Sequence, residues 1–193
     1  MATKHAPAAT RPDAATRKIE AYKRNNYDKA IEDNLKIENK YAEGPLIPWK
    51  LNACQRGLHL LWEQIRLFNL KRTAALAKFD KRVQVTDGPV NIVVVKERRG
   101  GVSSYCQARF LIHAMWTENY PVNVTAHKKT ATEKILKKAR TYHTAWRGDT
   151  ALWTQTTRHS DEEMSWSNGS SIYVATAGSE DSERGSQYRA AHL

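Results

Sequence analysis

The sequence predicts an α/β fold with a parallel-sheet core and an N-terminal helical region. The β-branched run at 90–95 is bounded by a turn and by charged residues, as is typical of a strand buried on both faces. A helical pattern from Ser103 to about Trp116 follows it, and a second strand pattern occupies 122–126. Because parallel strands are joined by right-handed helical crossovers, this order predicts a three-layer domain with helices on both faces of the sheet.

The composition is that of a globular protein: 40% of the 193 residues are hydrophobic and 26% are charged. These proportions exclude a largely disordered or fibrous chain. Cys54 and Cys106 are too few for a disulfide framework, and no paired Cys and His spacing indicates a zinc site. We find no apolar run long enough to span a membrane and no export signal. We therefore expect a soluble protein of a reducing compartment with no membrane partner.

The net charge of +11 is concentrated in the middle of the chain. Residues 51–150 contain 18 Lys and Arg against 7 Asp and Glu, whereas residues 151–193 contain 3 against 6. Such a basic block favours a polyphosphate partner, either a nucleic acid or a nucleotide. The alternative is a solvated basic surface that only keeps the protein soluble.

The first half of the chain is predicted to be helical. Residues 1–16 are expected to be a disordered tail, and 17–88 a helical N-terminal or lid region. Within this region the apolar spacing predicts helices over 17–41 and 51–68 and a basic amphipathic stretch over 71–82. The face of the second helix that points inward is expected to hold Leu58, Leu61, Trp62 and Ile65.

The second half, 89–193, is predicted to form the sheet core. Ser103 is expected to cap the first core helix. The spacing of Thr130 and Glu133 predicts a capping box at the start of a second helix that ends near Trp146. Strands at 164–166 and 171–176 are expected to form a hairpin across an Asn-Gly turn, and another strand begins near Tyr188. The first core helix is expected to bury Ala108, Leu111, Ile112 and Met115.

The segment between the first strand and its helix, 96–104, has the features of an anion cradle. Gly100 and Gly101 can adopt positive φ values and bring amide groups close to a phosphate. The helix N-terminus adds partial positive charge, and a serine there can bind Mg²⁺. The segment departs from the standard phosphate-binding loop, because Lys96 occupies the first glycine position and Val102 the lysine position. The cations that could neutralise a triphosphate are Lys96, Arg98 and Arg99.

These residues resemble the large subunit of tailed-phage DNA-packaging terminases, several of which carry the loop lysine at the front. Here the loop is Lys96-Glu-Arg98-Arg-Gly-Gly101-Val-Ser103-Ser104. The likeness extends to Asn123-Val-Thr-Ala-His127 and to the hairpin Asn168-Gly-Ser-Ser-Ile-Tyr-Val-Ala-Thr-Ala-Gly178. It also includes Leu51-Asn-Ala-Cys-Gln55-Arg, which resembles the segment whose glutamine contacts adenine. Near the end, Arg184-Gly185 and Ala191-His192-Leu193 are similar to the approach to the Walker B strand. Together these motifs cover about residues 50–193.

The resemblance implies a P-loop ATPase of the additional-strand class, which uses ATP and Mg²⁺ to drive double-stranded DNA into a preformed capsid. Ser103 would bind Mg²⁺, Gln55 would contact adenine, and Arg184 would act as the catalytic arginine, inserted into the site of a neighbouring subunit. The implied partners are DNA, the portal protein, the small terminase subunit and further copies in a ring, in the host cell cytoplasm. The phosphate site would be formed by Lys96, Arg98, Arg99, Gly100, Gly101, Val102, Ser103 and Ser104.

The sequence departs from the family pattern at two loop positions and at its end. Arg99 stands where glutamine is frequent, and Ser104 where threonine is frequent. The residues after Leu193 would contain the acidic Walker B pair, so the chain is expected to be a fragment that binds nucleotide weakly and hydrolyses it negligibly. The nearby acidic residues do not replace that pair, because they lie in a Gly- and Ser-rich loop: Glu180, Asp181 and Glu183.

Two other functions remain open from the sequence. One is a helicase-like translocase driven by ATP, although such proteins usually keep the loop lysine at the position of Val102. The other is a basic nucleic-acid-binding module without nucleotide chemistry. The basic helix expected over 128–140 could contact DNA phosphates, and its alternative is a solvated face.

Overall fold

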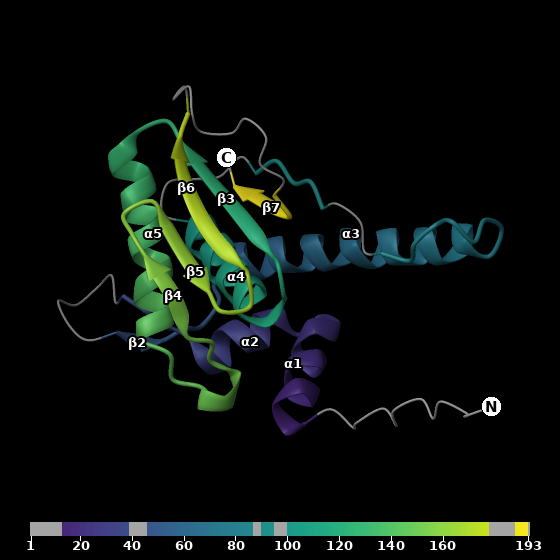
Figure 1. The fold of residues 1–193 in the computed structure, drawn as a ribbon, viewed down its shortest axis with the longest axis horizontal. Coiled ribbons are helices and arrows are strands. Elements are labelled where there is room, and N and C mark those ends of the chain that lie inside the picture. Colours follow the sequence, from purple (N-terminus) through teal and green to yellow (C-terminus); the bar gives the residue numbers. More distant parts are fainter. Residues whose placement is uncertain (1–12, 39–45, 87–89, 95–99, 178–187, 193) are drawn as a thin grey trace, which may run out of the picture.

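The computed structural model describes residues 13–38, 46–86, 90–94, 100–177 and 188–192. Its centre is a five-stranded sheet, drawn in front of the helices in Figure 1. In spatial order the strands are β4 (Thr156–His159), β5 (Glu163–Trp166), β6 (Ser171–Thr176), β3 (Pro121–Ala126) and β7 (Ala190–His192). Strand β3 pairs in parallel with β6 and β7, whereas β4–β5 and β5–β6 are antiparallel pairs. The predicted α/β class is therefore confirmed, with a mixed sheet whose parallel part is β6-β3-β7.

Two helices, α4 (Val102–Trp116) and α5 (Lys129–Thr144), pack against each other and against one face of this sheet. Among the described residues no helix covers the opposite face, so this part of the chain has two layers rather than the predicted three. Val122 and Val124 on β3 are fully buried and are paired with Ile172 and Val174 on β6. Side chains at alternate strand positions share a face, so one face of the sheet carries the core.

The helix predicted over 17–41 is divided into α1 (Ala14–Asn25) and α2 (Tyr27–Asn34). Asn26 separates them with φ −125° and ψ 36°, outside the helical region. Its side-chain amide donates to the carbonyl oxygen of Ala21, and such local bonds compete with the helix. Helix α1 begins inside the predicted tail, because the side chain of its N-cap Asp13 accepts a hydrogen bond from the backbone of Thr16.

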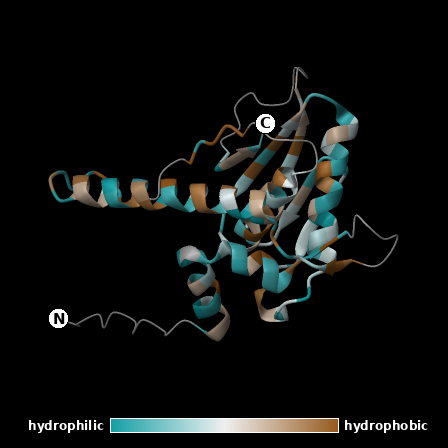
Figure 2. Cartoon of the chain, turned by 180° about the vertical axis from the view of Figure 1, so that it is seen from behind, coloured by the Kyte–Doolittle hydropathy of each residue, from teal (hydrophilic) through white to brown (hydrophobic). Residues whose placement is uncertain are grey.

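A two-stranded antiparallel ribbon, β1 (Lys36–Ile37) with β2 (Ile47–Pro48), precedes the long helix α3 (Ala53–Ala77). Helix α3 is continuous from the helix predicted over 51–68 into the basic amphipathic stretch predicted over 71–82. Its predicted inward face is partly wrong: Leu58 is buried, but Leu61 is 43% exposed. The distal part of α3 extends beyond the rest of the chain (Figures 1 and 2).

The strand predicted over 90–95 is wrong for the residues that the structure describes. Residues 90–94 have no strand partner, and Val93 is 96% exposed. A β-branched run becomes a buried strand only when neighbouring strands and layers cover it. The predicted crossover from this run through α4 to β3 is therefore not formed. The parallel crossover of the described sheet connects β3, through α5 and the β4–β5 hairpin, to β6.

The core helices confirm the predicted inward stripe, since Ala108, Leu111, Ile112 and Met115 are all buried. The capping box predicted at Thr130 and Glu133 is wrong. The N-cap of α5 is Lys128, two residues before Thr130, and no side chain caps the helix. The hydroxyl of Thr132 instead donates to the carbonyl oxygen of Lys129 within the first turn.

The predicted hairpin is confirmed as β5–β6, with Gly169 of the Asn-Gly turn at φ 78°. Strand β7 confirms the strand expected near the end of the chain, whereas β4 and the short 3-10 helix Thr150–Leu152 were not predicted. Within the described residues, every helix is too short or too polar to cross a membrane.

Candidate functional site

Helix α4 begins at a glycine in the left-handed conformation. Gly101 has φ 78° and ψ 6°, which residues with a side chain rarely adopt. A Cβ atom at this position would lie 2.6 Å from Nε2 of Gln55. Both the backbone angle and the available space therefore require glycine, and the predicted positive φ of Gly101 is confirmed.

Two side chains at the start of α3 donate hydrogen bonds to the carbonyl oxygens of this turn. Nδ2 of Asn52 donates to the oxygen of Gly100 at 3.3 Å, and Nε2 of Gln55 donates to the oxygen of Gly101 at 3.0 Å. In a trans peptide the N–H points opposite to the C=O. The amide groups of Gly101 and Val102 therefore point away from α3, at the positive end of the α4 dipole. This arrangement can accept an anion.

Gln55 has a second role at the start of its own helix. Its Oε1 accepts a hydrogen bond from the backbone N–H of Asn52, while Oδ1 of Asn52 accepts one from the N–H of Gln55, which completes a capping box. The side chain is buried and also receives a weak bond from Nε1 of Trp49 at 3.4 Å. Gln55 is thus brought to the predicted loop, and its contact with adenine stays a prediction.

Ser103 and Ser104 lie in the first turn of α4. The expectation that Ser103 is the N-cap is wrong, because the first helical bond runs from the N–H of Tyr105 to the oxygen of Gly101. Ser103 is half-buried, and its Mg²⁺ contact stays a prediction. Ser104 is buried, and its hydroxyl accepts a hydrogen bond from Nζ of Lys138 on α5 at 3.2 Å. A lysine that the motif does not contain therefore reaches this turn.

The structure brings Gln55 together with Gly100, Gly101, Val102, Ser103 and Ser104. Val102 is buried and anchors the first turn of α4 in the core. Four further predicted site residues lie outside the described residues: Lys96, Arg98, Arg99 and Arg184.

A buried ion pair that the sequence analysis missed joins α3 to α4. Arg109 is fully buried on α4, and its Nη2 donates to Oε1 of Glu63 at 2.6 Å. The guanidinium lies over the rings of Tyr27 and Trp62, 4.5 Å from each centroid. Burial alone would raise the pKa of Glu63, but Arg109 and Arg66 outweigh it and lower this pKa. Glu63 is therefore held as a carboxylate.

The same cluster reaches α2. Nη1 of Arg109 donates to the hydroxyl of Tyr105 at 3.1 Å, and Nδ1 of His59 lies 3.0 Å from that hydroxyl. On its other side, Nε2 of His59 lies 3.6 Å from Oδ1 of Asp28. Burial raises the pKa of Tyr105 to about 12, so this phenol stays protonated. The cluster fixes α4 against α2 and α3, and hence the turn at Gly101 against its two donors. A lone arginine amid the apolar residues of α4 was the available signal in the sequence.

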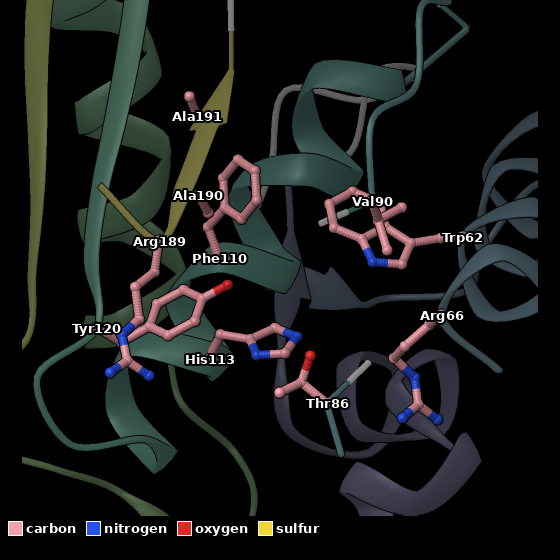
Figure 3. Close-up of a pocket in the computed structure, with 10 residues that line it drawn as sticks. All are labelled: Trp62, Arg66, Thr86, Val90, Phe110, His113, Tyr120, Arg189, Ala190 and Ala191. Carbon is pink, nitrogen blue, oxygen red and sulfur yellow. The ribbon is translucent and has the colours of Figure 1, made fainter. Parts of the chain in front are cut away.

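A separate pocket of about 420 Å³ opens between α3, α4 and β7 (Figure 3). Its walls include Trp62, Phe110 and Tyr120, and Arg189 lies at its edge. His113 stacks between Tyr27 and Tyr120 with centroid distances of 4.3 and 5.3 Å. Burial lowers the pKa of His113 well below its ordinary value, so this ring is neutral. Among the described residues, those that line this pocket include no predicted site residue.

Among the described residues, no three His, Cys, Asp or Glu side chains gather as a metal-binding group. Mg²⁺ in phosphate sites keeps several waters and takes ligands from the phosphates, so one serine hydroxyl suits such a site. The hydroxyl of Ser103 and the amide groups that point away from α3 are the kinds of donor that a Mg²⁺-nucleotide requires.

Comparison with models of known protein families finds no match, and a search of curated proteins also finds none. The likeness to terminases therefore depends on the sequence motifs alone.

Proposed function

We propose that the chain binds ATP with Mg²⁺ at the start of α4, as the ATPase region of a DNA-packaging motor similar to the large terminase subunit. The observation that carries the proposal is the orientation of the Gly101 turn. Its carbonyl groups are bonded to Asn52 and Gln55, so its amide groups face the opposite side. A phosphate on that side would receive backbone hydrogen bonds and the favourable end of the helix dipole.

Each residue of the turn would have its own role in binding the nucleotide. The amides of Gly101 and Val102 would bind phosphate, the hydroxyl of Ser103 would bind Mg²⁺, and Gln55 would hold the turn and contact adenine. Lys138, through its bond to Ser104, adds positive charge beside the first turn. Bound ATP would supply the phosphoanhydride bond whose hydrolysis drives movement, and Mg²⁺ would neutralise its phosphate charge. The proposal assigns the cations of the loop to Lys96, Arg98 and Arg99.

In the proposed motor the chain acts with double-stranded DNA, the portal protein and the small terminase subunit, as a ring of identical copies in the host cytoplasm. Arg184 would be the catalytic arginine donated to a neighbouring copy. The basic charge supports a DNA partner, since Lys128, Lys129, Lys134 and Lys137 of the α5 region are all exposed.

The test is a titration of a fluorescent ATP analogue into the wild type and single variants, with and without Mg²⁺. Lys96→Ala is expected to weaken binding at least tenfold, because it removes the cation assigned to the β- and γ-phosphates. Ser103→Ala is expected to abolish the gain in affinity that Mg²⁺ gives. Lys137→Ala, an exposed lysine on α5, is the matched control and should leave the affinity within twofold of the wild type.

Equal affinity of the wild type and Lys96→Ala would contradict the proposal. In that case, DNA binding that falls with salt and ignores both ATP and Lys96→Ala would identify the chain as a basic nucleic-acid-binding module. The exposed lysines of α5 are the observation that keeps this second candidate.

A further inference from the structure

The distal part of α3 exposes large apolar side chains. Phe68 is 64% exposed and Leu76 is 50% exposed, and Phe79, which follows the helix directly, is 91% exposed. Figure 1 shows this end of α3 extending past the sheet and the other helices, and Figure 2 shows apolar residues along it. Soluble proteins seldom expose several such side chains in one place unless the place is an interaction surface.

These side chains follow a helical repeat. Leu61, Phe68 and Leu76 are separated by seven and eight residues, which places them on one side of α3, and Phe79 lies in the turn that follows the helix. We call these four residues the apolar stripe. Thr73, three residues before Leu76, lies beside the stripe, and its hydroxyl donates to the carbonyl oxygen of Thr86 at 2.7 Å. The chain after α3 therefore folds back along one edge of the stripe, and among the described residues it leaves Phe68, Leu76 and Phe79 at least half exposed.

The surroundings of the stripe are strongly basic. In residues 64–82 the only acidic residue is Asp80, and it is paired with Arg82 at 2.9 Å. Lys71 and Arg72 follow Phe68 by three and four residues, so they flank it on the helix surface. The exposed cations of this segment are Lys71, Arg72, Lys78, Lys81 and Arg82.

We propose that the apolar stripe docks an acidic amphipathic helix of a partner protein. Such a helix would lay a row of leucine-like side chains against Leu61, Phe68 and Leu76, with Asp and Glu on either side facing the cations. Charge complementarity selects this occupant over a second copy of the chain, because two copies would bring two basic surfaces together.

The arrangement of the stripe also argues against two other anionic partners, a lipid surface and a nucleic acid. Arg72 lies between Phe68 and Leu76, four residues from each, and interrupts the row. A helix that lies in a lipid surface needs a broad apolar face, whereas a helix–helix seam tolerates a single polar residue. Nucleic acid would pair with the cations and leave the apolar side chains in water. A protein helix satisfies both features.

The experiment measures the affinity of two synthetic 21-residue peptides by fluorescence anisotropy. Both have leucine at the a and d positions of three heptads; one has glutamate at the e and g positions, and the other has lysine there. The glutamate peptide is expected to bind at least tenfold more tightly to the wild type. The double variant Phe68→Ser with Leu76→Ser is expected to lose that binding at least tenfold. The double variant Lys71→Glu with Arg72→Glu should reduce the preference between the two peptides.

Val93→Ser is the control, because Val93 is an exposed apolar residue, 96% exposed, that does not belong to α3. It should bind the glutamate peptide like the wild type. Circular dichroism of each variant verifies that it is folded. None of these changes touches the Gly101 turn, so ATP affinity should be the same in all of them, which separates this inference from the proposed function.

Three results would overturn the inference. Equal binding of the two peptides would show that charge does not select the occupant. Self-association of the wild type that Phe68→Ser abolishes would make a second copy the occupant. Binding to phosphatidylglycerol vesicles or duplex DNA that the stripe variant abolishes, without peptide binding, would assign the surface to that partner.

Discussion

The two halves of helix α3 differ in the kind of side chain that they bury and expose. The first half buries polar side chains, namely Gln55, His59 and Glu63, and each has a named partner on α4, α2 or the Gly101 turn. The second half exposes Phe68 and Leu76, which have no such cover among the described residues. The first half of α3 therefore holds α4 and the Gly101 turn in place, whereas the second half presents an exposed surface. Buried polar groups are retained when they are paired, and exposed apolar groups indicate a partner.

The largest change in stability is expected at the buried ion pair. Glu63→Ala is expected to destabilise the protein by about 3–5 kcal/mol, because it leaves the charge of Arg109 buried and uncompensated. Urea denaturation followed by circular dichroism measures the change. Asp80→Ala, which breaks the exposed pair with Arg82, is the control and should leave the denaturation midpoint unchanged. Equal midpoints for both variants would remove the ion pair as the support of α4.

The second test is at the turn that α3 supports. Gly101→Ala is expected to cost about 1–3 kcal/mol of unfolding free energy, since φ is positive and the added Cβ meets Gln55. Gly57→Ala is the matched control: Gly57 lies within α3 with nothing within 4 Å of its Cβ position. That change should stabilise the protein by about 0.5–1 kcal/mol. A neutral effect of Gly101→Ala would contradict the geometry of the turn.

The third test changes pH rather than sequence. Burial lowers the pKa of His59 and, much more, that of His113, so folding disfavours the protonated form of both rings, whereas the unfolded chain takes up protons near pH 6.5. This stability is present above that pH and is lost as the pH falls below it. We expect a loss of up to about 1.4 kcal/mol per pH unit for each histidine that stays neutral. Urea titrations at pH 7.5, 6.5 and 5.5 measure this loss, and His113→Gln should reduce it. A flat profile would contradict the burial of these rings.

The smallest effect is expected at the exposed end. The double variant Phe68→Ser with Leu76→Ser should change the unfolding free energy by no more than about 1 kcal/mol, because at least half of each residue is already exposed. Leu111→Ala in the core, by contrast, should cost about 2–5 kcal/mol. A large loss in the double variant would mean that the stripe packs within the chain and would break the comparison.

Sequence patterns succeeded where local chemistry decides the structure. The Asn-Gly turn, the buried stripe of α4 and the positive φ of Gly101 were all predicted, because each depends on residues close together in the chain. The buried strand at 90–95 was wrong, since burial depends on neighbours that the described chain does not place there. The ion pair of Glu63 and Arg109 was missed for the same reason, because the two residues are 46 positions apart in the sequence.

In the candidate site, too, features that depend on neighbouring residues could be predicted and features that depend on distant residues could not. The glycine turn and its serines could be found from the motif, whereas the donors of Asn52 and the bond from Lys138 to Ser104 could not, because they come from α3 and α5. Gln55 was found by resemblance to a family, and the contact now visible is with the carbonyl of Gly101. Its contact with a base stays a prediction.

The most direct test of the central claim is to record the backbone amide resonances of the ¹⁵N-labelled protein during a titration with Mg²⁺ and ATP. Phosphate binding at the Gly101 turn predicts saturable shifts of the amides of Gly101, Val102 and Ser103, with little change at Phe68 and Leu76. Unchanged resonances at the turn in saturating nucleotide would contradict the account. Shifts confined to Phe110, His113 and Arg189 would contradict it as well, and would place the nucleotide in the separate pocket.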